Sequence, residues 1–494
     1  MKEKRFTKGV AVCLVLAMVL GYVPEANFSL AETENPTAGT ESPSTVSGGA
    51  VSGGAVSGGA VSGGALETPT ATPTETPTAA PTATPIDDLS AYKLAATTLT
   101  ARGGASRVRL NWTKVTGAEG YYIYARTASE SAYKLLTTIK EGATAEYTKT
   151  SLVNGTTYYY RIAAYRTVNG VVVEGDLSTA VSATPASVSA TSKAAKKYST
   201  KAKFISSPAY KTYKKTKAAM NYSKSFAIPG MKNTNAGGFA CTSMVPQGIC
   251  LAGSYFLISA YDYKGTDYSV IYVVSRAAKS YITTIVLPSK AKVGGLAYDG
   301  TNVWVSKGKA VASFPYTVIT DAVNSGKKFT SLSSYQSVCA LDSTASFMGY
   351  YNDVLWVGTF KASASSTMKG YTLNNKETSP SLSPAYTMSV PSRTQGITFD
   401  NDGTMVLTRS YRTKKAKENY ISQVRTYRPS FASAGSSGKV LKNTALKVMK
   451  LPPMAEGVAI YGTYTYALFS SSYYKTCKYP VDRVLALKTN KLVV

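Results

Sequence analysis

The chain of 494 residues contains no histidine. Ser-His and Cys-His nucleophile pairs, histidine-ligated zinc and imidazole general bases are therefore excluded. The side chains whose spacing could do other chemistry lie in the C-terminal half, either directly before a glycine or at the end of the apolar strand that follows it. They are Gln247, Ser259, Tyr261, Gln395, Ser410, Tyr411, Arg412, Glu456 and Ser470. Tyrosine and arginine offer flat faces and fixed donors, which suit sugar rings or carboxylated sugars.

This set holds one carboxylate, Glu456, and one guanidinium, Arg412. A glycosidase needs two carboxyl groups that flank the bond, and a catalytic divalent ion needs several converging oxygen ligands. We therefore expect a binding site with no catalytic residue, no metal and no other cofactor. An enzyme remains the alternative: a polysaccharide lyase or hydrolase at the same place, with Tyr261 and Tyr411 as acid or base. A third reading is that these residues only seal a narrow channel by hydrogen bonding.

A repeated pattern must position these residues. Four segments of the C-terminal half place a glycine directly before an aliphatic residue, then a turn, then an apolar strand. Their glycines are Gly248, Gly295, Gly396 and Gly457. A weaker fifth unit lies between Val338 and Phe360, and Asp299-Gly300 and Asp402-Gly403 are hairpin signals. Repeats of roughly 40–60 residues with several strands each are typical of propeller blades.

On these repeats, residues 225–494 resemble the secreted bacterial β-propellers of the YVTN/NHL-like repeat kind. The resemblance implies five blades whose first strands line a central channel, which gathers Gln247, Gln395 and Glu456 at its mouth. We expect the ring to close across the two ends of the domain, with Arg483–Leu487 as third strand of the last blade and Ser225–Ile228 as its fourth.

Residues 89–187 alternate apolar and polar side chains in short runs. Trp112 lies on an early strand, and a Leu152-Val-Asn-Gly-Thr-Thr-Tyr158 corner leads into a later one. These features resemble a fibronectin type III module. The resemblance implies a seven-strand sandwich in which Trp112 is a core aromatic and Tyr158 hydrogen-bonds to upstream backbone. We expect this module to act as a spacer.

The other segments indicate export. Residues 1–31 read as a signal peptide cleaved after Ala31, and residues 32–88 as a disordered linker, rich first in Gly and Ser and then in Pro and Thr. Residues 188–224 are predicted as a lysine-rich linker, since 193–232 carry eleven lysines and no acid. Cys241, Cys250, Cys339 and Cys477 form either disulfides, whose pairing the sequence leaves open, or small buried thiols.

The sequence thus predicts an all-β chain: a fibronectin type III-like sandwich plus a five-bladed β-propeller, preceded by a signal peptide and a disordered linker. Its formal net charge of +28 at pH 7 favours polyanionic partners. We predict a secreted, cell-surface-associated, monomeric bacterial protein that binds an extracellular glycan or an anionic cell-wall polymer without catalysis. Nucleic acid is not expected as a partner, and no membrane span is expected after signal cleavage.

Overall fold

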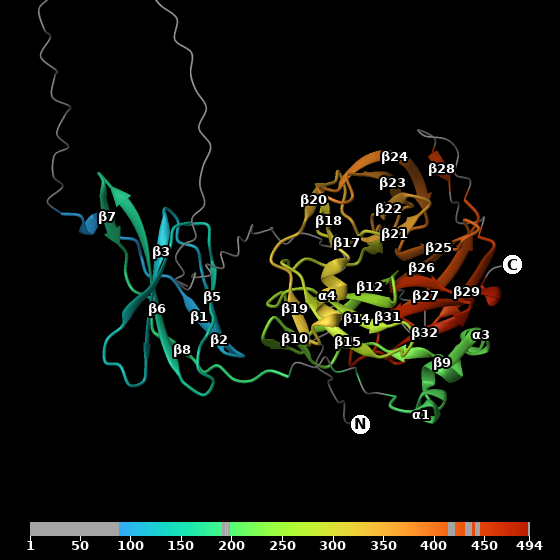
Figure 1. The fold of residues 1–494 in the computed structure, drawn as a ribbon, viewed down its shortest axis with the longest axis horizontal. Coiled ribbons are helices and arrows are strands. Elements are labelled where there is room, and N and C mark those ends of the chain that lie inside the picture. Colours follow the sequence, from blue (N-terminus) through green and yellow to red (C-terminus); the bar gives the residue numbers. More distant parts are fainter. Residues whose placement is uncertain are drawn as a thin grey trace, which may run out of the picture.

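The computed structural model divides the chain into two β parts, which Figure 1 shows side by side. The residues that it describes are 88–189, 193, 195, 198–412, 420–429, 437–439 and 445–492. The predicted signal peptide and all but the last residue of the predicted 32–88 linker lie outside the described residues.

The N-terminal part is a sandwich of two antiparallel sheets. One sheet has the strand order β1-β2-β5, and the other has the order β4-β3-β6-β7, with β8 also paired to β6. The elements are η2 (Ser90–Tyr92), β1 (Leu99–Gly104), β2 (Arg107–Trp112), β3 (Gly120–Thr127), β4 (Lys134–Ile139), β5 (Glu146–Lys149), β6 (Tyr158–Val168), β7 (Val171–Glu174) and β8 (Val181–Ala183).

The core of this sandwich holds the two aromatic residues that the resemblance singled out. Trp112 is buried, and its ring lies 5.3 Å from that of Tyr121 between the sheets. The hydroxyl of Tyr158 accepts a hydrogen bond of 3.2 Å from the backbone N–H of Val153, which fastens the corner before β6. Both predicted roles are therefore confirmed.

In the described residues the C-terminal part contains five sheets of four or five strands, besides one two-stranded hairpin. The first sheet consists of β12 (Met244–Ala252), β13 (Tyr255–Asp262), β14 (Val270–Ser275), β15 (Tyr281–Val286) and β19 (Phe329–Ser331). The second consists of β16 (Leu296–Tyr298), β17 (Asn302–Ser306), β18 (Ala310–Pro315) and β20 (Ser337–Ala340). Helix α4 (Thr317–Asn324) lies between β18 and β19.

The remaining three sheets complete this part. The third sheet consists of β21 (Phe347–Tyr351), β22 (Val354–Gly358), β23 (Ser366–Asn374), β24 (Ser381–Val390) and β28 (Ser437–Lys439). The fourth consists of β25 (Thr394–Phe399), β26 (Met405–Arg412), β27 (Tyr420–Tyr427) and β29 (Lys447–Leu451). The fifth consists of β30 (Ala455–Tyr461), β31 (Tyr464–Phe469), β32 (Arg483–Lys488) and β9 (Met220–Ala227). A short hairpin, β10 (Thr234–Ala236) with β11 (Phe239–Cys241), precedes them, and η4 (Thr489–Lys491) follows β32.

The first strands of the five sheets pack against one another in sequence. β12 contacts β16, β16 contacts β21, β21 contacts β25, β25 contacts β30, and β30 contacts β12 again. Glycine permits this approach, because a Cβ on Gly248 would lie 2.8 Å from the carbonyl oxygen of Gly294, and one on Gly457 would lie 2.7 Å from the N of Ile249. Each sheet remains open, so the strands make no hydrogen-bonded barrel among the described residues.

The last sheet is completed from the other end of the domain. β9 pairs with β32, with Arg483 opposite Ala227 and Val484 opposite Phe226. The predicted pairing of Arg483–Leu487 with the segment around Ser225 is thereby confirmed, and β9 begins five residues earlier than expected. The sheet therefore joins the two ends of the C-terminal part.

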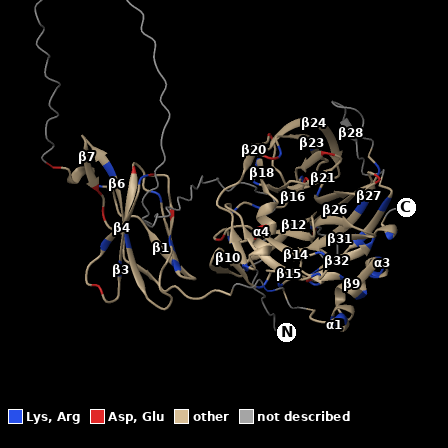
Figure 2. Ribbon diagram, viewed as in Figure 1, with Lys and Arg blue, Asp and Glu red and all other residues tan. Residues whose placement is uncertain are grey.

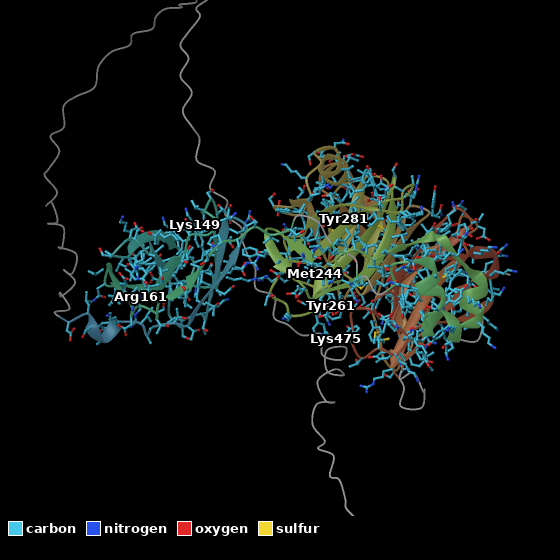
Figure 3. All side chains as sticks on the ribbon, turned by 90° about the horizontal axis from the view of Figure 1, so that it is seen from below. Lys149, Arg161, Met244, Tyr261, Tyr281 and Lys475 are labelled. Carbon is cyan, nitrogen blue, oxygen red and sulfur yellow. The ribbon has the colours of Figure 1, made fainter. Side chains whose placement is uncertain are left out.

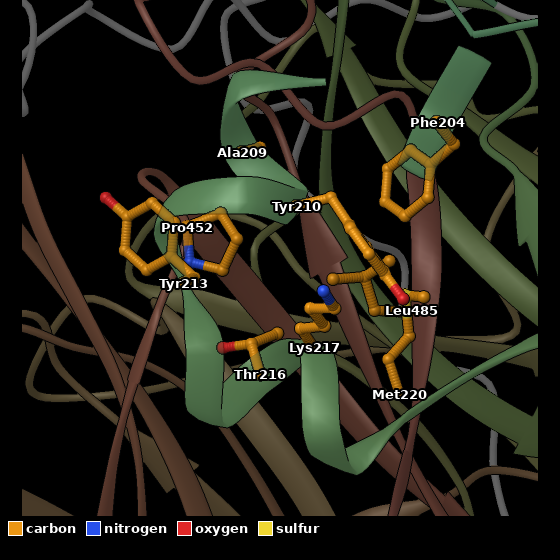
Figure 4. Close-up of a pocket in the computed structure, with 9 residues that line it drawn as sticks. All are labelled: Phe204, Ala209, Tyr210, Tyr213, Thr216, Lys217, Met220, Pro452 and Leu485. Atoms are coloured by element: carbon orange, nitrogen blue, oxygen red, sulfur yellow. The ribbon is translucent and has the colours of Figure 1, made fainter. Parts of the chain in front are cut away.

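Residues 198–219, predicted as linker, are folded instead. They form the short helices α1 (Lys201–Ile205), α2 (Pro208–Thr212) and α3 (Lys214–Ala219). The prediction was wrong here because it relied on the lysines, which are exposed at most positions, and overlooked that the aromatic residues between them can be buried. Phe204 is fully buried, and the guanidinium of Arg483 lies 4.8 Å from the centre of its ring. Figure 4 shows these helices around an apolar pit of about 10 Å³, too small for a ligand.

Candidate ligand-binding site

Glu456 is the second residue of β30, where the first strands of the five sheets meet. Its side chain is buried, and one carboxyl oxygen accepts a hydrogen bond of 2.6 Å from the hydroxyl of Ser470, just after β31. Burial raises the pKa of Glu456 to about 8, against the opposing effects of the Ser470 hydrogen bond and the positive charge of Lys292. The carboxyl group is therefore mostly neutral at pH 7.

Aromatic residues from two strands and one loop lie near this carboxyl group. Tyr261, Tyr420 and Tyr474 each interact electrostatically with Glu456, and the amino group of Lys292 lies 5.7 Å from the ring centre of Tyr261. Burial raises the pKa of Tyr261 and Tyr474 further above the usual tyrosine value. The structure thus brings together three predicted residues, namely Glu456, Ser470 and Tyr261.

Lys292, Tyr420 and Tyr474 were not predicted from the sequence. Lys292 and Tyr474 lie in the loops before β16 and after β31, and Tyr420 begins β27. None of them occupies a position that recurs from one repeat to the next, so the pattern that located Glu456 gave no signal for them.

Hydroxyl groups in the middle of the second strands join neighbouring sheets. Ser259 accepts a hydrogen bond from the N–H of Gly248 and donates one to the carbonyl of Val293. Thr408 likewise donates to the backbone carbonyl of Glu456 in the next sheet. Ser259 is fully buried, so its hydrogen-bonding capacity is used within the fold.

The predicted residues of β26 adjoin the Glu456 cluster through β27, because Arg412 pairs with Tyr420, and Ser422, the partner of Ser410, accepts a hydrogen bond from the N–H of Ala455. The Ser410 hydroxyl bonds to that of Ser422, and the ring of Tyr411 lies under the guanidinium of Arg393 at 4.5 Å. Arg412 is exposed at the end of the strand. Two glutamines complete the set: Gln247, half-buried, donates to the carbonyl of Pro246, and Gln395 is half-buried on β25.

A cleft of about 490 Å³ opens beside the Glu456 cluster and shares Tyr474 with it. Its lining is Met231, Lys232, Thr242, Tyr263, Tyr473, Tyr474, Lys475 and Thr476. We call it the tyrosine–lysine cleft. In Figure 3, Tyr261 of the cluster and Lys475 of the cleft are labelled near each other, seen from below.

The three tyrosines of the cleft stand at steep angles to one another. The rings of Tyr473 and Tyr474 are 5.0 Å apart and nearly perpendicular, and that of Tyr263 lies 5.9 Å from Tyr473. Lys232 and Lys475 are exposed, and no acidic side chain is among the described residues that line the cleft. The cleft therefore offers aromatic faces together with positive charge, and Figure 2 shows further basic residues elsewhere in the C-terminal part, on helices α1 and α3.

One group of described residues has the proximity of a metal site but not its chemistry. Cys241, Asp262 and Asp267 are buried with ligand atoms within 4.8 Å of one another. Burial alone would raise the pKa of Asp262, but hydrogen bonds from Ser243 and from the backbone of Asp267 hold it at about 2. Asp267 is paired with Arg102 and Arg109. Because hydrogen bonds already satisfy the carboxylate of Asp262 and arginines already pair with that of Asp267, we assign no metal here.

Three cysteines are free thiols. Cys241, Cys250 and Cys339 form no disulfide. Burial raises the pKa of Cys241 to about 12, and it also raises that of Cys250, so neither is a reactive thiolate at neutral pH. For these residues the alternative of unbridged thiols holds.

Among known proteins, similarity is found to solved structures. No protein-family model matches the chain, and no curated protein matches it. A solved structure of a β-1,2-glucanase from Parabacteroides distasonis is 22% identical over 20% of this chain and 13% of its own, with a TM-score of 0.18. This chain therefore spans only a small part of the glucanase.

Other similar structures are single modules. A Fn3-like protein from Clostridium thermocellum is 28% identical over 17% of this chain and 88% of its own, with a TM-score of 0.15. The FN5 domain of Drosophila Lar is 18% identical over 19% of this chain and 99% of its own, with a TM-score of 0.16. The N-terminal sandwich is fibronectin type III-like, with two sheets, a buried tryptophan and a corner tyrosine.

Proposed function

We propose that the chain is a secreted, cell-surface-associated binding protein without catalytic activity, which holds an acidic glycan in the tyrosine–lysine cleft. The observation that carries the proposal is the lining of the cleft: three tyrosines, two lysines and no acidic side chain among the described residues. Export rests on the predicted signal peptide and on the fibronectin type III-like module. Among the described residues, no helix combines the length and the apolar character needed to cross a bilayer.

We interpret the C-terminal part, residues 225–494, as a five-bladed β-propeller. Three features support this: the cyclic order in which the first strands contact one another, the glycines at their closest approach, and the sheet that β9 completes from the other end of the chain. In such a ring the loops at one end surround the channel mouth. Glu456, Tyr261 and the cleft would share that mouth.

The shape and charge of the cleft suit an oligosaccharide with carboxylate groups. Its volume lies in the usual range of ligand pockets, about 300–1,000 Å³. Tyrosine faces can cover the apolar C–H faces of sugar rings, and the exposed lysines can pair with carboxylates as adaptable point charges. The net charge of +28 would also draw a polyanion toward the molecule.

Binding is tested by isothermal titration of the chain, as secreted, with polygalacturonate and with the neutral glucan pullulan. Lys232→Ala combined with Lys475→Ala should weaken polygalacturonate binding at least tenfold at low salt, and Tyr263→Ala with Tyr474→Ala should weaken it at every salt concentration. Lys327→Ala with Lys328→Ala removes the same charge from an exposed site elsewhere and is the matched control. Absence of binding to polygalacturonate at low salt would refute the proposal.

A second candidate, a polysaccharide lyase or hydrolase, is favoured by one observation. A buried glutamic acid with a pKa of about 8 is in the protonation state that a general acid requires at neutral pH. Release of unsaturated or reducing ends from polygalacturonate, abolished by Glu456→Gln, would establish this activity. Binding without release of such ends supports the non-catalytic proposal.

A further inference from the structure

The two β parts of the chain are in direct contact. The turn between β1 and β2 lies against the turn between β10 and β11, an approach that Figure 1 shows. The N–H of Ala105 donates to the carbonyl of Gly238 at 2.9 Å, and the Arg107 guanidinium donates to the carbonyl of Gly237 at 2.9 Å. A module that acted only as a spacer would not need these bonds.

A buried set of charges crosses the same contact. Arg102 donates to both carboxyl oxygens of Asp267 at 2.9 Å, and Arg109 donates to one of them at 3.1 Å. The side chains of Arg109 and Asp267 are only 4% and 2% exposed. The Arg109 guanidinium also lies 4.1 Å above the ring of Phe239. Removing both arginines would leave Asp267 buried without these cationic partners, which is costly.

In a second ion pair the acidic residue belongs to the N-terminal part and the basic residue to the C-terminal part. Glu146 of β5 accepts a 2.7 Å hydrogen bond from Lys290 and lies 3.7 Å from Arg109. Burial alone would raise the pKa of Glu146, but the positive charges of Lys290 and Arg109 lower it. Both parts thus contribute charges of both signs, which fixes one orientation of the module.

The same contact holds a segment that lines the tyrosine–lysine cleft. Asp267 ends a loop that begins at Asp262, whose carboxylate accepts bonds from the backbone N–H groups of Lys264, Thr266 and Asp267. Tyr263 of the cleft lies inside this loop. The loop is therefore tied by Asp262 at one end and by the two arginines of the fibronectin type III-like module at the other.

We propose that Arg102 and Arg109 are positioning residues for the ligand cleft: by fixing Asp267 they hold the Tyr263 loop in its binding conformation. The inference rests on the proposed function for its ligand, but the docking of the module stands independently of it. The fibronectin type III-like module then raises the affinity of the cleft for its ligand, in addition to acting as a spacer. Its arginines touch no ligand and affect binding only through the loop.

The test uses the whole chain with Arg102→Ala and Arg109→Ala combined, and Arg109→Glu as a second variant that places a negative charge beside Asp267. Lys114→Ala with Lys140→Ala removes the same charge from exposed positions of the same module and is the control. Small-angle X-ray scattering reports docking, and titration with polygalacturonate reports the cleft. Circular dichroism verifies that each variant is folded.

We expect both arginine variants to increase the radius of gyration and to weaken polygalacturonate binding about five- to tenfold, with the control unchanged. Undocking with unaltered affinity would refute the positioning role while leaving the proposed function intact. Variants that remain docked would show that the charges do not hold the contact, which also refutes the inference. If the wild-type chain is docked but binds no polygalacturonate, the proposed function fails and docking alone remains.

Discussion

Glu456 provides a quantitative test of the site where the first strands converge. Its pKa is about 8 in the folded chain, against an ordinary value of 4.5. Between these values the unfolded chain releases a proton that the folded chain retains, so the free energy of unfolding falls as pH rises. Each pH unit in this window is worth about 1.4 kcal/mol. From pH 5 to pH 8 the wild-type chain should therefore lose up to about 4 kcal/mol.

Glu456→Gln removes this titration and retains an oxygen that can accept from Ser470. The variant should match the wild-type chain at pH 5 within about 1 kcal/mol and should exceed its stability progressively as pH rises, levelling off above pH 8. Urea unfolding followed by tryptophan fluorescence at each pH measures the difference. Glu377→Gln, an exposed glutamate of the same part, is the control and should run parallel to the wild-type chain.

A constant difference between Glu456→Gln and wild type from pH 5 to pH 8 would mean that the carboxyl group is ionised in the folded chain. In that case the buried environment inferred for it would be incorrect, and the convergence of β30 with its neighbours would have to admit water. A difference that grows with pH in the control as well would assign the effect to other groups.

Two substitutions test how the sheets are built and joined. Gly457→Ala should destabilise the C-terminal part by about 3 kcal/mol, because the new methyl group would lie 2.7 Å from the backbone N of Ile249. Thermal unfolding measures this against Gly326→Ala, where nothing lies within 4 Å of the new methyl group and only the left-handed backbone, with φ 64°, costs about 1 kcal/mol. Asp299→Asn should cost about 1–3 kcal/mol in urea unfolding, because the buried carboxylate accepts from the Trp304 indole at 2.7 Å and from two backbone N–H groups.

The outcomes that contradict these two predictions differ. Equal costs for the two glycine substitutions would mean that the first strands do not pack at the spacing described. For Asp299, the exposed Asp321→Asn is the reference, and an equally small loss at both positions would show that the hairpin does not depend on its carboxylate.

The repeats were predictable from the sequence wherever close packing dictates residue type. Gly248, Gly295, Gly396 and Gly457 were found because a strand that approaches its neighbour closely excludes a Cβ. The fifth, Gly349, was not singled out, because it is followed by tyrosine and not by the aliphatic residue that follows the other four glycines. The same pattern singled out Glu456, yet it gave no signal for loop residues such as Lys292.

Long-range charge pairing could not be predicted from the sequence, for a different reason. Arg109 alternates with apolar residues on β2 and has the pattern of an ordinary solvent-facing position, while its partner Asp267 is 158 positions away. Periodicity describes which face of a strand a residue occupies, not what covers that face. The lysine-rich segment illustrates the same limit, since Phe204 is buried against Arg483 from the far end of the chain.

The Arg109–Asp267 pair and the Phe204–Arg483 contact join the N-terminal module and the lysine-rich segment to the part of the chain that carries the cleft. The fibronectin type III-like module meets the C-terminal part at the β10–β11 hairpin, and Thr242 of the cleft directly follows that hairpin. Tyr263 reaches the cleft from the loop that the module's arginines hold. Two of the residues that line the cleft are thus adjacent in sequence to groups that the module fixes. Because a loop fixed before binding loses less conformational entropy when a ligand arrives, docking should raise affinity without any added ligand contact.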